Sequence, residues 1–217
     1  MGLWLGEGMK REDFTTWTEY DPGGCLTVAE HLAHYVGPAE SPDECWLYKA
    51  ASVPTFFVHK VTIQPIIIYG TVGNKGVWGA DDLAPTSSDM IPELGLVIVP
   101  GQSAGQYGLE LFCTSLGQTS SSPSALTEGE AKDVTIRRVG TLLTADFSGD
   151  VPEHPYMSVT CGDAPLGYLW CSYVASGNGF SAEWYIGPLD IGGPQRRRAL
   201  LTGGGLGTRR LRTGGRL

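Results

Sequence analysis

Apolar residues take every second position on both sides of a short polar break, and this pattern constrains the fold more than any other feature of the chain. Leu94, Leu96 and Ile98 alternate with Gly and Val before the break at 100–105, and apolar side chains alternate again after it. Successive side chains of a strand point to opposite faces, while Pro and Gly favour turns. We therefore predict a β-hairpin over 94–116.

The rest of the chain has the pattern of short strands separated by turns. Its 31 Gly and 14 Pro residues favour turns, and strand-rich runs occur at 43–51, 55–69 and 134–147. No helical pattern exceeds about three turns. We predict an all-β protein: a jelly-roll-like β-sandwich followed by a smaller β-sandwich, with one short helix.

The short helix is predicted after residue 27. Thr27 and Glu30 have the spacing of a capping box, in which each side chain accepts a hydrogen bond from a main-chain N–H at the helix start. Val28, Leu32 and Tyr35 would then share one helix face, and the Gly-Pro pair that follows would end the helix.

A run of short polar residues divides the chain. The segment 118–130, QTSSSPSALTEGE, has almost nothing to bury and is predicted to be a hinge or linker. We expect a sandwich domain over 1–117, a second β-domain over 131–193 and a flexible tail over 194–217.

The tail is strongly basic, although the chain as a whole has a net charge of −8. Seven of the fifteen basic residues lie in the tail, which has no acidic residue: Arg196, Arg197, Arg198, Arg209, Arg210, Arg212 and Arg216. Arginines on a flexible segment suit contacts with RNA phosphates. The alternative is a disordered appendage without a function.

Four short motifs carry a resemblance to a known family. They are EYDP at 19–22, TVAEHLAHY at 27–35, CWLY at 45–48 and the hairpin at 95–116. In this order they resemble the coat proteins of small icosahedral plant RNA viruses, the tombusvirus and carmovirus group. The segment from 130 onward would then be the protruding domain.

The resemblance implies a structural protein, a capsid subunit that assembles with copies of itself around an RNA genome, located in the virion and in the host cytoplasm during assembly. It also implies calcium between subunits. Asp81 and Asp82 lie on a loop before the predicted hairpin and are our candidates for the calcium ligands.

No motif in the chain predicts catalysis or a membrane segment. There is no G-x-S-x-G motif, no phosphate-binding loop and no apolar stretch near the roughly 20 residues of a transmembrane helix. We therefore predict a protein that is not an enzyme. A carbohydrate- or receptor-binding β-sandwich module is the alternative, and a glycosidase stays open because acidic and aromatic residues are plentiful. The five cysteines have no metal-like spacing and are predicted to be reduced, mostly buried thiols.

Overall fold

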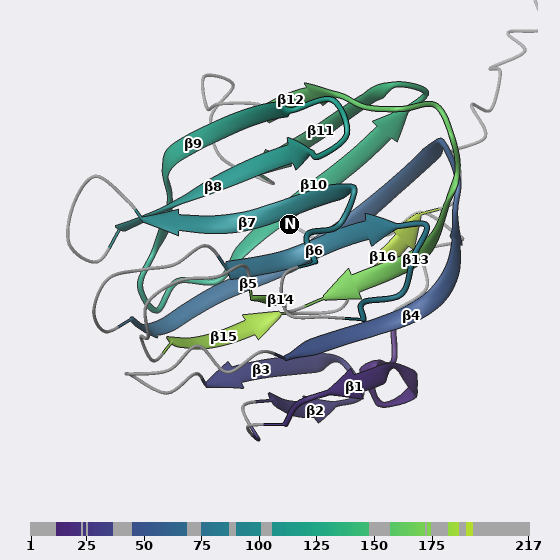
Figure 1. The fold of residues 1–217 in the computed structure, drawn as a ribbon. Coiled ribbons are helices and arrows are strands. Elements are labelled where there is room, and N and C mark those ends of the chain that lie inside the picture. Colours follow the sequence, from purple (N-terminus) through teal and green to yellow (C-terminus); the bar gives the residue numbers. More distant parts are fainter. Residues whose placement is uncertain are drawn as a thin grey trace, which may run out of the picture.

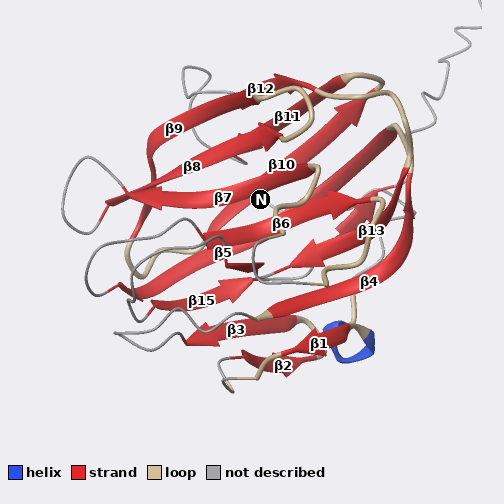
Figure 2. Cartoon of the chain, viewed as in Figure 1, coloured by secondary structure: helices blue, strands red, loops and turns tan. Residues whose placement is uncertain are grey.

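The computed structural model describes residues 12–22, 24, 26–36, 45–68, 75–86, 90–100, 106–147, 157–171, 173–174, 182–186 and 190–192. These residues form two antiparallel β-sheets stacked face to face (Figures 1 and 2). The one helical element among them is the 3-10 turn η1 (Phe14–Thr16). Within the described residues, no helix has the length and apolar character needed to cross a membrane.

The two sheets each contain eight strands. The front sheet has the order β1 (Thr18–Tyr20), β4 (Trp46–Val53), β13 (Leu166–Cys171), β6 (Lys75–Asp81), β7 (Leu94–Pro100), β8 (Gln106–Cys113) and β9 (Gln118–Thr127), with β14 (Tyr173–Val174) also paired to β6. The back sheet has the order β12 (Met157–Thr160), β11 (Leu142–Phe147), β10 (Lys132–Val139), β5 (Phe56–Ile68), β15 (Ala182–Ile186), β3 (Leu32–Val36) and β2 (Leu26–Ala29), with β16 (Asp190–Gly192) paired to β5.

The hairpin predicted from the period-two pattern is confirmed. Strands β7 and β8 pair in an unbroken antiparallel register from Leu94 opposite Cys113 to Pro100 opposite Tyr107. Leu96 and Ile98 are buried in the main core between the sheets. Val97 is buried as well, in a second cluster with Trp46, Phe112 and Trp170 on the other face of the front sheet. The front sheet therefore carries apolar side chains on both faces.

The predicted helix is wrong, because the segment forms the hairpin of β2 and β3. Leu26 lies opposite Tyr35 and Val28 opposite Ala33. Leu26, Ala33 and Tyr35 are buried, so every second side chain faces the core, whereas a helix would have placed its buried residues three or four positions apart. The period-two burial outweighs the local capping signal.

The segment predicted to be a linker contains strand β9, which pairs with β8 at the end of the front sheet. Its Ser122 and Leu126 are buried, while Thr119 and Ser121 face outward. Short polar side chains and a Pro are compatible with an edge strand, because an edge strand has one side without a partner.

Strands from before and after the segment 118–130 are interleaved in both sheets. Strand β13 lies between β4 and β6, and β10 lies between β11 and β5 (Figure 1). A separate second sandwich is therefore not seen among the described residues, which differs from the predicted arrangement. The cysteine prediction holds for Cys113, Cys161 and Cys171, which are buried and free; Cys45 is buried as well, and Cys25 lies outside the described residues.

Candidate functional site

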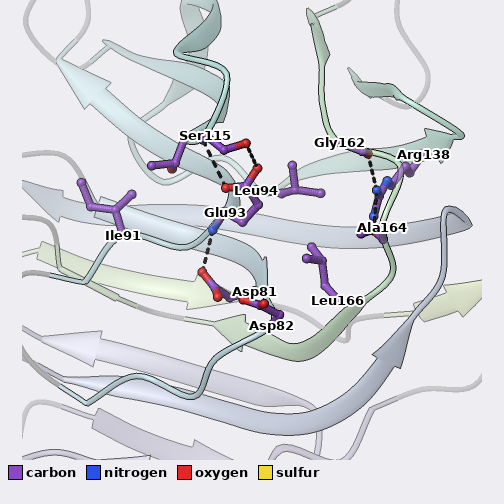
Figure 3. A pocket seen from close by; sticks show the side chains of 11 residues that line it. Asp81, Asp82, Ile91, Glu93, Leu94, Ser115, Arg138, Gly162, Ala164 and Leu166 are labelled. Carbon is purple, nitrogen blue, oxygen red and sulfur yellow. Dashed lines mark hydrogen bonds between the residues drawn. The ribbon is translucent and has the colours of Figure 1, made fainter.

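A pocket of about 320 Å³ lies at one end of the sandwich, where several strands of both sheets end (Figure 3). The front sheet contributes residues around the end of β6, the start of β7 and the turn after β8. The back sheet contributes a residue at the end of β10, and the connection from β12 to β13 completes the wall. The lining residues are Asp81, Asp82, Ile91, Glu93, Leu94, Thr114, Ser115, Arg138, Gly162, Ala164 and Leu166.

Asp81 holds the two ends of the β6–β7 connection together. Its Oδ1 accepts a hydrogen bond from the main-chain N–H of Leu83 at 2.9 Å, and its Oδ2 accepts one from the N–H of Glu93 at 2.8 Å. Burial raises the pKa of the Asp81 carboxyl, the two N–H donors lower it, and the adjacent Asp82 raises it, so that the net shift is upward. Asp81 thus positions the loop that carries the exposed Asp82.

Glu93 is fixed at the start of β7 by residues that follow β8. Its Oε1 accepts hydrogen bonds from the Ser115 hydroxyl at 2.5 Å and the Cys113 thiol at 3.2 Å, and its Oε2 accepts one from the N–H of Ser115 at 3.2 Å (Figure 3). The Thr114 hydroxyl donates to the carbonyl oxygen of Pro92 at 2.7 Å. The carboxylate and hydroxyl groups on this wall therefore have set positions before any ligand arrives.

Arg138 supports the opposite wall. Its side chain lies between the sheets and is 2% exposed. Nη2 donates to the carbonyl oxygens of Gly162 at 2.6 Å and Ala164 at 2.8 Å, and Nε donates to that of Gly140 at 3.2 Å. Nη1 is buried without a hydrogen-bond partner in the described part of the chain. The guanidinium thus fixes the shape of the β12–β13 connection.

The structure brings the two predicted site residues, Asp81 and Asp82, to this pocket, and adds Glu93 and Arg138, which the sequence analysis missed. The sequence pattern could have predicted that Arg138 is buried, because Val134, Ile136 and Arg138 occupy every second position of one strand and so point to the same face. The arginines predicted to contact RNA lie outside the described residues. Within the described ranges no group of three or more His, Cys, Asp or Glu side chains could hold a metal ion.

The lining has the chemistry of a site for a neutral, hydroxyl-rich ligand. Carboxylate oxygens of Asp82 and Glu93 accept hydrogen bonds, and the Ser115 hydroxyl oxygen, whose hydrogen is donated to Glu93, can accept one as well. Ile91 and Leu166 add apolar surface to the wall. A few convergent polar groups beside apolar side chains are the usual composition of a small-molecule site. The three carboxyl groups outnumber the one guanidinium, which disfavours an anionic ligand.

No family model matches the sequence, and no curated protein matches it. Solved structures do match in fold. The legume lectin-like domain from Entamoeba histolytica is 14% identical, with a TM-score of 0.58 over 84% of this chain and 95% of that one. The exoplasmic/lumenal domain of VIP36, solved with Ca²⁺ and Man3GlcNAc bound, is 10% identical, with a TM-score of 0.59 over 85% of this chain and 90% of that one. The β-glucanase of Bacillus licheniformis is 10% identical, with a TM-score of 0.54 over 87% of this chain and 99% of that one.

These matches give the chain a lectin-like β-sandwich fold, and the predicted resemblance to viral coat proteins is wrong, as is the capsid function that it implied. The motifs that carried the resemblance form other elements here. The EYDP motif leads from β1 into a hairpin rather than a helix, and the 94–116 hairpin continues directly into β9 rather than a hinge. Glycine-rich strands with period-two patterning occur in many β-sandwiches, so the motifs did not distinguish between them.

Proposed function

We propose that the protein is a carbohydrate-binding β-sandwich module and that the pocket at the end of the sandwich holds a neutral sugar unit. The observation that carries this proposal is the set of polar groups fixed around an apolar wall: Glu93 held by Ser115, Asp82 on the loop held by Asp81, and Leu166 beside them. Hydroxyl groups of a sugar would donate to the carboxylates and to the Ser115 hydroxyl oxygen, whose own hydrogen is bound by Glu93, while a C–H face of the ring would pack on Ile91 and Leu166.

The fold comparisons agree with this class of ligand, since a lectin-like domain and a domain solved with an oligosaccharide are among the similar structures. A β-glucanase is among them too, so the binding test is accompanied by an assay for hydrolysis. We expect binding without turnover. Release of new reducing ends from the bound oligosaccharide would instead make the protein a glycosidase.

The described residues do not fit a calcium site at Asp81 and Asp82. Both oxygens of the Asp81 carboxylate already accept main-chain hydrogen bonds, whereas Ca²⁺ requires six to eight oxygen ligands. VIP36 was solved with Ca²⁺ bound, which makes the contrast testable. We expect sugar binding by this protein to persist after dialysis against EGTA.

The experiment is a glycan array followed by isothermal titration of the best neutral sugar. Asp82→Asn and Ser115→Ala should each weaken binding roughly tenfold, the loss of about 1–2 kcal/mol of hydrogen bonding. Asp146→Asn is the matched control, because Asp146 is an exposed carboxylate on the back sheet. Unchanged affinity of both pocket variants, with or without an effect of the control, would contradict this location of the site.

A further inference from the structure

Aromatic side chains form a strip on the outer face of the front sheet, away from the main core. The strip, as we define it, consists of Tyr168 on β13, Tyr48 and Trp46 on β4 and Tyr20 on β1. Tyr48 and Tyr168 have ring centroids 6.5 Å apart, and the rings of Tyr20 and Trp46 are tilted against each other at 4.6 Å. Strands β13, β4 and β1 are neighbours in the sheet, so the four rings lie on adjacent strands.

The strip begins at the pocket. Tyr168 lies directly opposite Asp81 in the β13–β6 pairing, so both side chains point to the same face of the sheet. The preceding Gly167 is in contact range of the main chain of Asp82, since a Cβ atom on it would lie 3.4 Å from the Asp82 carbonyl oxygen. With strands about 4.8 Å apart and residues about 3.4 Å apart along a strand, the strip extends about 20 Å from Asp81 to Tyr20.

The β6–β7 connection closes the other side of the strip. The indole N–H of Trp170 donates to the carbonyl oxygen of Leu83 at 3.3 Å, and Pro92 lies so close to Gly79 that an added Cβ atom would be 2.7 Å from its Cγ. The centre of the outer face is therefore covered. The accessible direction from the pocket runs across β13 and β4 to the edge strand β1.

Three of the four rings in the strip are accessible to a ligand. Tyr20 is 48% exposed, and Tyr48 and Tyr168 are half-buried. Trp46 is 3% exposed, and its indole N–H has no acceptor among the described residues.

We infer that the natural ligand is an extended neutral oligosaccharide, whose end unit occupies the pocket and whose following units stack on the aromatic strip. This inference rests on the proposed function. The apolar C–H faces of sugar rings bury area against aromatic rings, and the tyrosine hydroxyls stay available for hydrogen bonds. The path of about 20 Å from Asp81 across the strip to Tyr20 has room for more than one sugar unit, so affinity depends on chain length.

The test is a titration series with chain length as the variable. The probes are glucose with cello-oligosaccharides of two to six units, and mannose with α-manno-oligosaccharides of two to five units. We expect affinity to rise roughly tenfold or more between one and four units of the series that binds. Tyr20→Ala and Tyr168→Ala should remove most of this rise and leave the affinity for the monosaccharide within about twofold, as expected for groups that contact only the later units.

Two further variants and one spectrum separate stacking from damage to the fold. Tyr168→Phe keeps the ring and should keep the dependence on chain length. Phe56→Ala on the back sheet removes an aromatic ring of similar exposure, 55%, and should change nothing. The indole N–H resonance of Trp46 should shift with the tetrasaccharide and stay in place with the monosaccharide.

The outcomes distinguish the two proposals. Binding of a monosaccharide with no gain in affinity for longer chains, or a gain that survives Tyr20→Ala and Tyr168→Ala together, would overturn the inference and leave the pocket proposal standing. Failure of every probe and of the glycan array would overturn both.

Discussion

The indole N–H of Trp78 donates a hydrogen bond of 3.0 Å to Nδ1 of His59 in the interior of the sandwich. Trp78 belongs to β6 of the front sheet and His59 to β5 of the back sheet, so the bond joins the two sheets. His59 is 1% exposed and stacks on Phe57 with the ring centroids 4.4 Å apart. Nδ1 must be unprotonated to accept the bond, which makes the neutral imidazole the form that the fold requires.

This bond predicts a loss of stability in acid. Burial, and secondarily the charge of Lys49, lower the pKa of His59 from 6.5 to about 3. The unfolded chain, with an ordinary histidine pKa, binds a proton that the folded chain does not bind. The contribution of the neutral His59 to the unfolding free energy is therefore complete above about pH 6.5 and is lost as the pH falls toward 3; it is at most roughly 5 kcal/mol.

Urea unfolding at several pH values between 7 and 4 measures this loss. His59→Gln, although less stable at pH 7, should show a weaker dependence of its unfolding free energy on pH than the parent protein. Parallel curves for His59→Gln and the parent would contradict the assignment to His59.

Asp81 should matter for stability where its neighbour Asp82 does not. Asp81→Ala leaves two main-chain N–H groups, those of Leu83 and Glu93, without their acceptor, and should cost roughly 1–3 kcal/mol of unfolding free energy. Asp82→Ala removes an exposed carboxylate and should change it by less than about 0.5 kcal/mol. Urea titration of both variants decides the matter, and equal stabilities would show that the Asp81 bonds are not important.

Gly79 is expected to tolerate no side chain. A Cβ atom at this position would lie 2.7 Å from Cγ of Pro92 and 3.3 Å from the carbonyl oxygen of Leu94. Gly79→Ala should therefore displace the β6–β7 connection and lower the unfolding free energy by roughly 1–3 kcal/mol. Gly162→Ala, which would meet nothing within 4 Å, is the matched control in a calorimetric comparison. A Gly79→Ala protein as stable as Gly162→Ala would refute the close contact.

Replacement of Arg138 by another residue should lower the unfolding free energy. Its guanidinium donates to three carbonyl oxygens, and Arg138→Lys cannot reproduce that planar set of bonds. We expect Arg138→Lys to lower the unfolding free energy by roughly 2–4 kcal/mol and Arg138→Met by at least as much, because carbonyls of Gly162 and Ala164 lose their donor. Arg137→Lys, at an exposed position on the same strand, should have little effect. Chemical denaturation of the three variants measures the difference.

Several features of the site were accessible from the sequence because they depend on local patterns. The period-two runs predicted the β7–β8 hairpin, and the two adjacent acidic residues before it marked one wall of the pocket. Arg138 and the aromatic strip were not found. Arg138 reaches carbonyls 24 and 26 residues away, and Tyr168 meets Asp81 only because β13 pairs with β6. No local pattern encodes such distant partners.

The local sequence pattern led to a wrong prediction for the segment after residue 27, where a helix-capping signal competed with a strand pattern. Thr27 and Glu30 have helix-capping spacing, but Leu26, Val28, Ala33 and Tyr35 pair across a hairpin and bury one face against the core. Burial of apolar area contributes more free energy than one cap, so the strand arrangement prevails.

The sequence by itself determined that this chain is built of strands, because alternating apolar residues and frequent glycine and proline favour strands and turns and exclude long helices. The tertiary structure alone decided how the strands are ordered. Strand β13 lies between β4 and β6, and β10 lies between β11 and β5, which merges the two expected domains into one sandwich and forms the pocket and the aromatic strip. The physical reason is that strand order depends on the fit of whole sheet faces to each other, and a period-two pattern specifies a face without specifying its partner.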